Sequence, residues 1–177
     1  MSCDRSRESG TSFPEIYKKV YSHSALVGTL RGVDVASVIL VATAYAAGLA
    51  YALVHSVIFG IEVLSLSALP FIFLSLFRKK INAPRPYELY DFISEGIAVP
   101  GHTGGKSFPS RHVFSAMLIG GLYCFFCLPV GITVLALGLL LSVCRVLLGI
   151  HFIRDVVAGG LIGVILGCGG GVILILV

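Results

Sequence analysis

Residues 144–155, CRVLLGIHFIRD, place an arginine, a histidine and a carboxylate in a part of the sequence that is otherwise almost free of charge. From position 113 onwards the only charged residues are Arg145, Arg154 and Asp155. His151 and Asp155 are four positions apart, so on a helix they would share one face. A carboxylate placed there can keep one imidazole nitrogen protonated and leave the other free to attack, as a histidine nucleophile requires. An isolated pair of this kind is more often a structural hydrogen bond, so the other polar residues matter.

Two further polar clusters flank the one long polar stretch, residues 78–112. Its start carries four basic residues, namely Arg78, Lys79, Lys80 and Arg85, and its end carries Ser110, Arg111 and His112. The planar guanidinium fork matches phosphate oxygens two hydrogen bonds at a time, and the free N–H groups of a helix that opens at Ser110 also favour an anion. A second histidine, His112, could protonate a leaving oxygen and later activate water. The clusters therefore predict a phosphate site, whereas Lys79, Lys80 and Lys106 are also explained as anchors to lipid headgroups.

The composition indicates the environment that must position these residues. The chain is 56% hydrophobic and 12% charged, against about 25% charged residues in soluble domains. Five apolar runs approach the roughly 20 residues that a membrane-spanning helix needs, and they cover residues 33–54, 57–77, 113–128, 130–148 and 155–177. The predicted fold class is therefore all-α: a polytopic transmembrane helix bundle of about five spans, with an active-site loop between spans two and three.

The runs also predict the domain organisation and the place where the clusters meet. Residues 1–30 form a polar N-terminal arm, and residues 31–177 form the transmembrane domain. Within the arm, residues 13–30 are weakly amphipathic, which fits either an interfacial helix or a solvated arm. A short turn at Pro129 joins the third and fourth spans, so residues 145–155 return to the side of the polar loop. The three clusters are therefore expected to meet at one face of the membrane.

Small residues and isolated acids complete the predictions for the apolar runs. Glycines recur every fourth position on one face of the last run, at Gly159, Gly163, Gly167 and Gly171. Such spacing lets helices approach closely, and it predicts packing within the chain, with a homo-oligomer through this face as the alternative. Cys124-x-x-Cys127 is interpreted as packing rather than as a metal site. Asp34 and Glu62 lie near the starts of their runs, where a carboxylate is expected to reach the membrane interface.

These residues resemble the type 2 phosphatidic acid phosphatase family, the membrane lipid phosphate phosphatases. The family's signatures are a lysine, six residues and Arg-Pro; then Pro-Ser-Gly-His; then Ser-Arg, five residues, His, three residues and Asp. Here the corresponding segments are RKKINAPRP from Arg78, PSRH from Pro109, and CRVLLGIHFIRD. Three positions depart from the pattern, because Arg78 stands in place of lysine, Arg111 in place of glycine and Cys144 in place of serine.

The resemblance implies a role for each matching residue. His151 would be the nucleophile, Asp155 its orienting partner, and His112 the general acid and base. The phosphoryl oxygens would be held by Arg78, Arg85, Ser110 and Arg145, with Arg111 as an addition. The implied mechanism has two steps through a phosphohistidine and needs no cofactor and no metal, with charge stabilisation lowering most of the barrier.

The implied partners are the bilayer and a lipid phosphate substrate, and no nucleic acid. Candidate substrates are phosphatidate, phosphatidylglycerol phosphate and a polyprenyl diphosphate, and the loop from Tyr87 to Lys106 is expected to shape the choice. A lipid phosphotransferase and a non-catalytic lipid-phosphate binding or transport protein are the alternatives. The expected location is a bacterial plasma membrane. The side of the active site stays open, because the positive-inside rule favours the cytoplasm for the 13 Lys and Arg residues, whereas the family more often works on the outer face.

Overall fold

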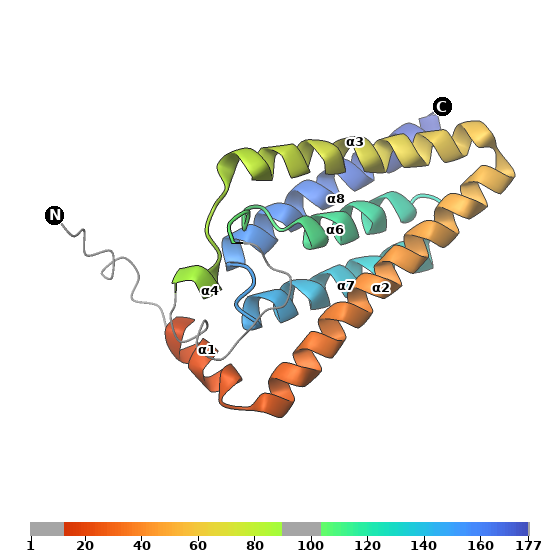
Figure 1. The fold of residues 1–177 in the computed structure, drawn as a ribbon. Helices are drawn as coiled ribbons and strands as arrows, with labels where there is room; N and C mark the ends of the chain where they lie inside the picture. The colour runs from red at the N-terminus through yellow and green to blue at the C-terminus, as the bar shows by residue number, and fades with distance from the viewer. Residues whose placement is uncertain (1–12, 90–103, 177) are drawn as a thin grey trace.

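The structure of the protein is a computed structural model that describes residues 13–89 and 104–176 (Figure 1). Seven helices occur in these ranges, and the described residues contain no strand. They are α1 (Phe13–Tyr21), α2 (Ser24–His55), α3 (Val57–Ile81), α4 (Pro86–Leu89), α6 (Arg111–Tyr123), α7 (Leu128–Leu147) and α8 (Ile153–Leu176). The predicted all-α class is confirmed.

Four stretches of the described chain are long and apolar enough to cross a membrane. They are Ser24–His55, Val57–Leu89, Leu128–Leu147 and Ile153–Leu176. Large apolar side chains remain exposed along them, among them Val54, Phe73 and Ile165. An outer surface of this kind fits lipid rather than water, so the chain is an integral membrane protein.

Helix α6 differs from the predicted third span, which was expected to cover residues 113–128. It ends at Tyr123 and has 13 residues, which at about 1.5 Å per residue is shorter than the hydrocarbon core of about 30 Å. Ten of its residues are buried. Because the other helices enclose α6, it does not need the length of a helix that faces lipid.

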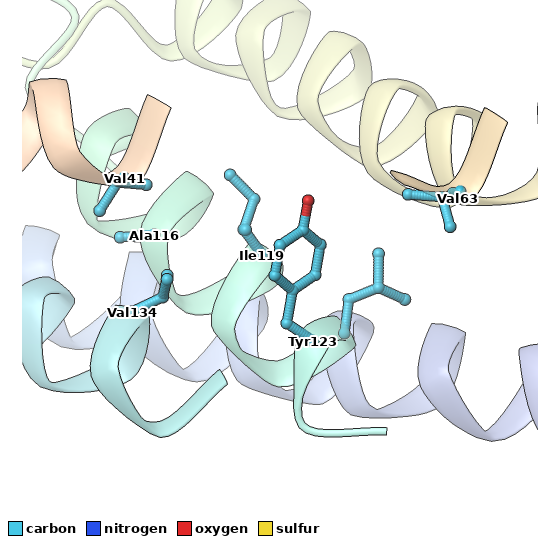
Figure 2. Packing of buried hydrophobic residues seen from close by; sticks show 8 residues of the cluster. Val41, Val63, Ala116, Ile119, Tyr123 and Val134 are labelled. Carbon is cyan, nitrogen blue, oxygen red and sulfur yellow. The ribbon is translucent and has the colours of Figure 1, made fainter. Parts of the chain in front are cut away.

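The core of the bundle forms around α6 (Figure 2). The apolar side chains of α6 meet those of the helices that surround it. In Figure 2, α6 contributes Ala116, Ile119 and Tyr123, and the outer helices contribute Val41, Val63 and Val134. The Tyr123 hydroxyl also donates a hydrogen bond to the Tyr45 carbonyl oxygen at 2.9 Å, which ties the end of α6 to α2.

The glycine face of α8 packs against α6 of the same chain, as predicted. A Cβ atom at Gly159 would lie 2.5 Å from the Ser110 carbonyl oxygen, and one at Gly163 would lie 2.5 Å from that of Phe114. Gly167 and Gly171 are crowded in the same way by Leu118 and Phe125. The alternative, a homo-oligomer through this face, is not supported because α6 already occupies it.

The N-terminal arm contains α1 and the first turns of α2, so its predicted end at residue 30 falls inside a helix. α1 has one buried side, formed by Tyr17 and Val20. The Tyr21 hydroxyl donates a hydrogen bond to the Leu148 carbonyl oxygen at 2.9 Å. This contact places α1 beside the loop between α7 and α8; its position along a membrane surface stays a prediction.

Candidate active site

Four helix ends meet at one end of the bundle and carry the predicted site residues (Figure 1). Helices α3 and α7 end there, and α6 and α8 begin there. The charge of Arg78 interacts with those of Arg85, Arg111, Arg145 and Asp155, and the two histidines, His112 and His151, are also within electrostatic range of each other. The structure therefore brings together all eight residues that the sequence singled out.

The predicted pair of His151 and Asp155 is present, but the two residues do not share a helix. Helix α8 begins at Ile153, so His151 lies in the loop before it and Asp155 lies in its first turn. His151 Nδ1 is 3.6 Å from Asp155 Oδ2, which is longer than a hydrogen bond. The Phe152 N–H donates to the same carboxylate oxygen at 3.0 Å. The carboxylate therefore caps the helix and faces Nδ1, which leaves Nε2 free of this contact.

Ser107 is a site residue that the sequence analysis missed. Its hydroxyl donates a hydrogen bond to Asp155 Oδ2 at 2.5 Å and lies 3.4 Å from His151 Nδ1. The side chains of all three residues are buried. Ser107 lies three positions before the PSRH segment's serine, and no spacing rule used above pointed to it.

Burial controls the protonation state of His151. Burial is the main cause that lowers its pKa from the ordinary 6.5 to about 4. The contact with Asp155 opposes this effect, and the nearby charges of Arg85 and Arg145 lower the pKa further. At neutral pH the imidazole is therefore uncharged, which is the form that can act as a nucleophile.

Ser110 joins the start of α6 to the start of α8. It is the N-cap of α6, and its backbone N–H donates to the Asp155 carbonyl oxygen at 2.8 Å. Its hydroxyl is buried and has no hydrogen-bond partner among the described residues. Buried hydroxyls are nearly always paired, so this one is a free donor for a ligand at the helix N-terminus.

Arg145 is held between an acid and a histidine. Asp34 accepts two hydrogen bonds from it, from Nε at 2.9 Å and from Nη2 at 3.1 Å. Arg145 Nη1 lies 2.8 Å from His112 Nδ1. Because arginine only donates, His112 accepts at Nδ1 and carries its proton on Nε2. The expectation that Asp34 reaches the membrane interface is wrong, because its side chain is buried against this arginine.

Arg78 and Arg85 hold the segment that precedes α6. Arg78 is buried and donates from Nη2 to the Lys106 carbonyl oxygen and from Nη1 to that of Pro109. Arg85 donates from Nε to the Gly105 carbonyl oxygen at 3.0 Å. A guanidinium carries five N–H donors, so each arginine shapes this loop and keeps donors for an anion.

Arg111 is the most exposed of the four arginines. Its guanidinium carbon lies 5.5 Å from the ring centroid of Phe71 on α3, a cation–π distance. It is therefore placed at the rim of the site, between the polar end and the apolar flank of the bundle.

An apolar cavity of about 360 Å³ begins beside the site and runs between α2, α3 and α6. His112 is its only lining residue from the predicted site. Apolar side chains form most of its wall, including Val38, Val41, Phe71, Ile119 and Leu141. An apolar chain joined to a phosphate could therefore fill this cavity with its head beside His112.

The loop that was expected to shape substrate choice, residues 87–106, is described only at its two ends. Residues 90–103 lie outside the described residues. At the ends, Glu88 Oε1 accepts a hydrogen bond from the Gly105 N–H at 2.6 Å. This contact connects α4 to the segment that carries Ser107.

The described residues thus gather four arginines, two histidines and two buried carboxylates at one end of a bundle of apolar helices. The sequence profile of the PAP2 superfamily matches residues 41–173. This match covers most of the sequence, and the chain belongs to the PAP2 superfamily, as its signatures predicted. It is an integral membrane phosphatase of that family.

One solved structure is similar over nearly the whole chain. It is the crystal structure of a transmembrane PAP2-type phosphatidylglycerolphosphate phosphatase from Bacillus subtilis, with 18% identity and a TM-score of 0.40 over 91% of each chain. No curated protein matches the sequence significantly.

Proposed function

We propose that this protein hydrolyses a lipid phosphate monoester or diphosphate through a phosphohistidine formed on His151, without a metal. The observation that favours a lipid is the apolar cavity of about 360 Å³ that begins at His112. A soluble phosphate ester would leave that cavity unfilled, whereas a lipid tail would bury its apolar surface there. The phosphoryl head then lies among the arginines at the membrane boundary.

The first step forms a bond between His151 Nε2 and phosphorus and breaks the bond between phosphorus and the lipid oxygen. Asp155, with Ser107 beside it, keeps the proton of His151 on Nδ1. The leaving oxygen takes a proton from His112. Arg145 Nη1 contacts His112 Nδ1. When Nη1 donates to the phosphate instead, with Arg145 still held by Asp34, His112 takes a proton from solvent at Nδ1. The charged imidazole then gives its Nε2 proton to the leaving oxygen.

The second step returns the enzyme to its starting state. His112, now neutral, accepts a proton from water, and the water oxygen bonds to phosphorus. The bond between phosphorus and His151 Nε2 breaks, and inorganic phosphate leaves. His112 returns its Nδ1 proton to solvent as Arg145 Nη1 comes back to that nitrogen. Arg78, Arg85, Arg145 and the free hydroxyl of Ser110 donate to the phosphoryl oxygens, where charge stabilisation lowers the barrier most.

The test is release of inorganic phosphate by the detergent-purified protein in EDTA. The substrates are phosphatidate, phosphatidylglycerol phosphate and a polyprenyl diphosphate. His151→Ala is expected to abolish release, and His55→Ala, at the opposite end of the bundle, is its matched control. Phosphate transfer to an alcohol without release, or no turnover by folded parent protein, would overturn the proposal.

A second comparison tests whether the cavity holds the lipid tail. Ala68 lines the cavity, and Ala68→Phe would fill part of it. For the lipid, kcat/KM is expected to fall about tenfold or more, whereas turnover of a short soluble phosphate ester stays the same. Ala47→Phe adds the same ring at an exposed position of α2 and is expected to change neither; equal losses for both substrates would contradict a tail in this cavity.

A further inference from the structure

Asp34 is a buried carboxylate on α2, a helix that contributes none of the eight predicted site residues. Its partner is Arg145 at the end of α7, which is 111 positions away in the sequence. Helices α2 and α7 pack against each other along the bundle (Figure 1). The pair therefore connects the first long helix of the fold directly to the phosphate site.

The geometry of this pair leaves one edge of the guanidinium facing away from the acid. Asp34 Oδ1 accepts from Nε at 2.9 Å, and Oδ2 accepts from Nη2 at 3.1 Å. A two-point contact of this kind fixes the plane as well as the position of a guanidinium. The remaining nitrogen, Nη1, lies 2.8 Å from His112 Nδ1. Asp34 thus determines which nitrogen of Arg145 meets the histidine.

A buried ion pair seldom adds much stability compared with apolar residues of the same shape, because both charges must lose water. Ionisable side chains inside membrane bundles are correspondingly rare and usually functional. The pair between Asp34 and Arg145 therefore requires an explanation other than adhesion between α2 and α7. Orientation of a group that acts on the substrate is the explanation that the contacts favour.

We propose that Asp34 is a positioning residue for phosphoryl hydrolysis, which holds Arg145 so that its Nη1 edge faces His112 and the phosphate. The proposal rests on the proposed function. It assigns to α2 a part in the chemistry that none of the three signature segments contains.

The first test is Asp34→Asn, which keeps the side chain's size and removes its charge. The amide can accept at one point only, so Arg145 loses its fixed plane while its own charge becomes uncompensated. We expect kcat to fall by about 10- to 100-fold, the range found when an orienting partner is removed. Inhibition by inorganic phosphate is expected to stay as strong or become stronger, because the site becomes more positive. Weaker phosphate inhibition in folded protein would overturn the proposal.

A double-mutant cycle separates orientation from a general structural role. If Asp34 acts through Arg145, adding Asp34→Asn to Arg145→Ala changes kcat by less than about twofold. An independent, additive loss in that background would overturn the proposal. Glu62→Gln is the matched control, because it neutralises another acid in an apolar helix, near the start of α3 and away from the site.

Two further measurements keep the test informative. Should Asp34→Asn fail to fold, Asp34→Glu retains the charge but displaces the guanidinium by one methylene. Its kcat must then fall while its thermal unfolding midpoint stays at the parent's value, and a parent-level kcat overturns the proposal. Should the parent release no phosphate from any lipid, the proposed function fails. The double-mutant cycle is then repeated with the Kd for inorganic phosphate, measured by calorimetry, in place of kcat. If Asp34→Asn still changes this Kd in the Arg145→Ala background, the positioning role is overturned.

Discussion

At the scale of single residues, the site depends on side chains that share one carboxylate. Asp155 accepts hydrogen bonds from the Ser107 hydroxyl and from the Phe152 N–H, and it faces His151 at 3.6 Å. The histidine alone therefore does not satisfy the acid. The orientation of the histidine therefore depends on Ser107, whose hydroxyl contacts both His151 and Asp155.

Removing the Ser107 hydroxyl tests this arrangement. Hydrogen bonds to charged groups contribute about 1.5–3 kcal/mol, so Ser107→Ala is expected to lower kcat by about tenfold or more, with KM little changed. Steady-state phosphate release provides the measurement. Ser142→Ala is the control, because that hydroxyl only donates to the Gly138 carbonyl oxygen of its own helix. An unchanged kcat in Ser107→Ala would mean that the hydroxyl does not orient the pair.

The low pKa of His151 predicts how stability depends on pH. In the folded protein the imidazole takes up a proton near pH 4, whereas in the unfolded chain it does so near its ordinary 6.5. Between these values the unfolded state binds more protons, so stability falls as the pH falls through this window. Thermal unfolding in detergent is expected to show a steeper loss from pH 6.5 to pH 4 in the parent than in His151→Gln. Equal slopes would contradict a buried, neutral histidine.

At the scale of elements, the site depends on the close approach of α6 and α8. The glycine face of α8 brings the first turn of this helix against Ser110. Helix α8, which carries Asp155, and helix α6, which carries His112, therefore begin next to each other. A shift between the two helices would separate Asp155 from the proposed phosphate site.

Two glycines of α8 allow a matched test of this packing. A Cβ at Gly163 would lie 2.5 Å from the Phe114 carbonyl oxygen, whereas one at Gly169 would have nothing within 4 Å. Gly163→Ala is expected to lower stability by about 1–3 kcal/mol, as overpacking does, and to lower activity. Gly169→Ala is expected to be neutral or stabilising by up to about 1 kcal/mol, because alanine favours helix. The measurements are unfolding midpoints and phosphate release, and an equal response of the two variants would show that the face is not tightly packed.

At the scale of the whole molecule, the two ends of the bundle differ in charge. The described Lys and Arg residues lie at the site end. They are on α1, the first turns of α2, the end of α3, the link from α3 to α4, the segment before α6, the start of α6 and the α7–α8 boundary. The turns at the other end, at Ser56 and between Tyr123 and Leu128, contain neither residue type. The positive-inside rule therefore predicts that the active site faces the cytoplasm.

Cysteine labelling in intact cells can test this orientation. In a variant whose native cysteines are replaced, Ser56→Cys marks the turn away from the site and Ser22→Cys marks the turn beside α1. A membrane-impermeant maleimide is expected to label Ser56→Cys in intact cells, and Ser22→Cys only after the membrane is opened. The reverse pattern would place the site on the outer face.

The sequence by itself determined the membrane environment, the helical class and the family, and it singled out the eight residues that the fold brings to one end of the bundle. These properties follow from apolar run lengths and from chemistry confined to short segments, such as the spacing of His151 and Asp155. Their meeting at one end also followed, because short turns between long helices force the chain to return.

Only the tertiary structure decided which partners complete the site and how α6 fits into it. Asp34 looked like an interfacial acid in the sequence, because nothing local relates it to an arginine on a helix that is distant in the chain. Ser107 acquired its role from the fold of its loop against α8, and α6 is short because its neighbours enclose it. Such contacts depend on how helices that are distant in the sequence pack together. The lengths of apolar runs and the spacing of residues along the chain do not predict them.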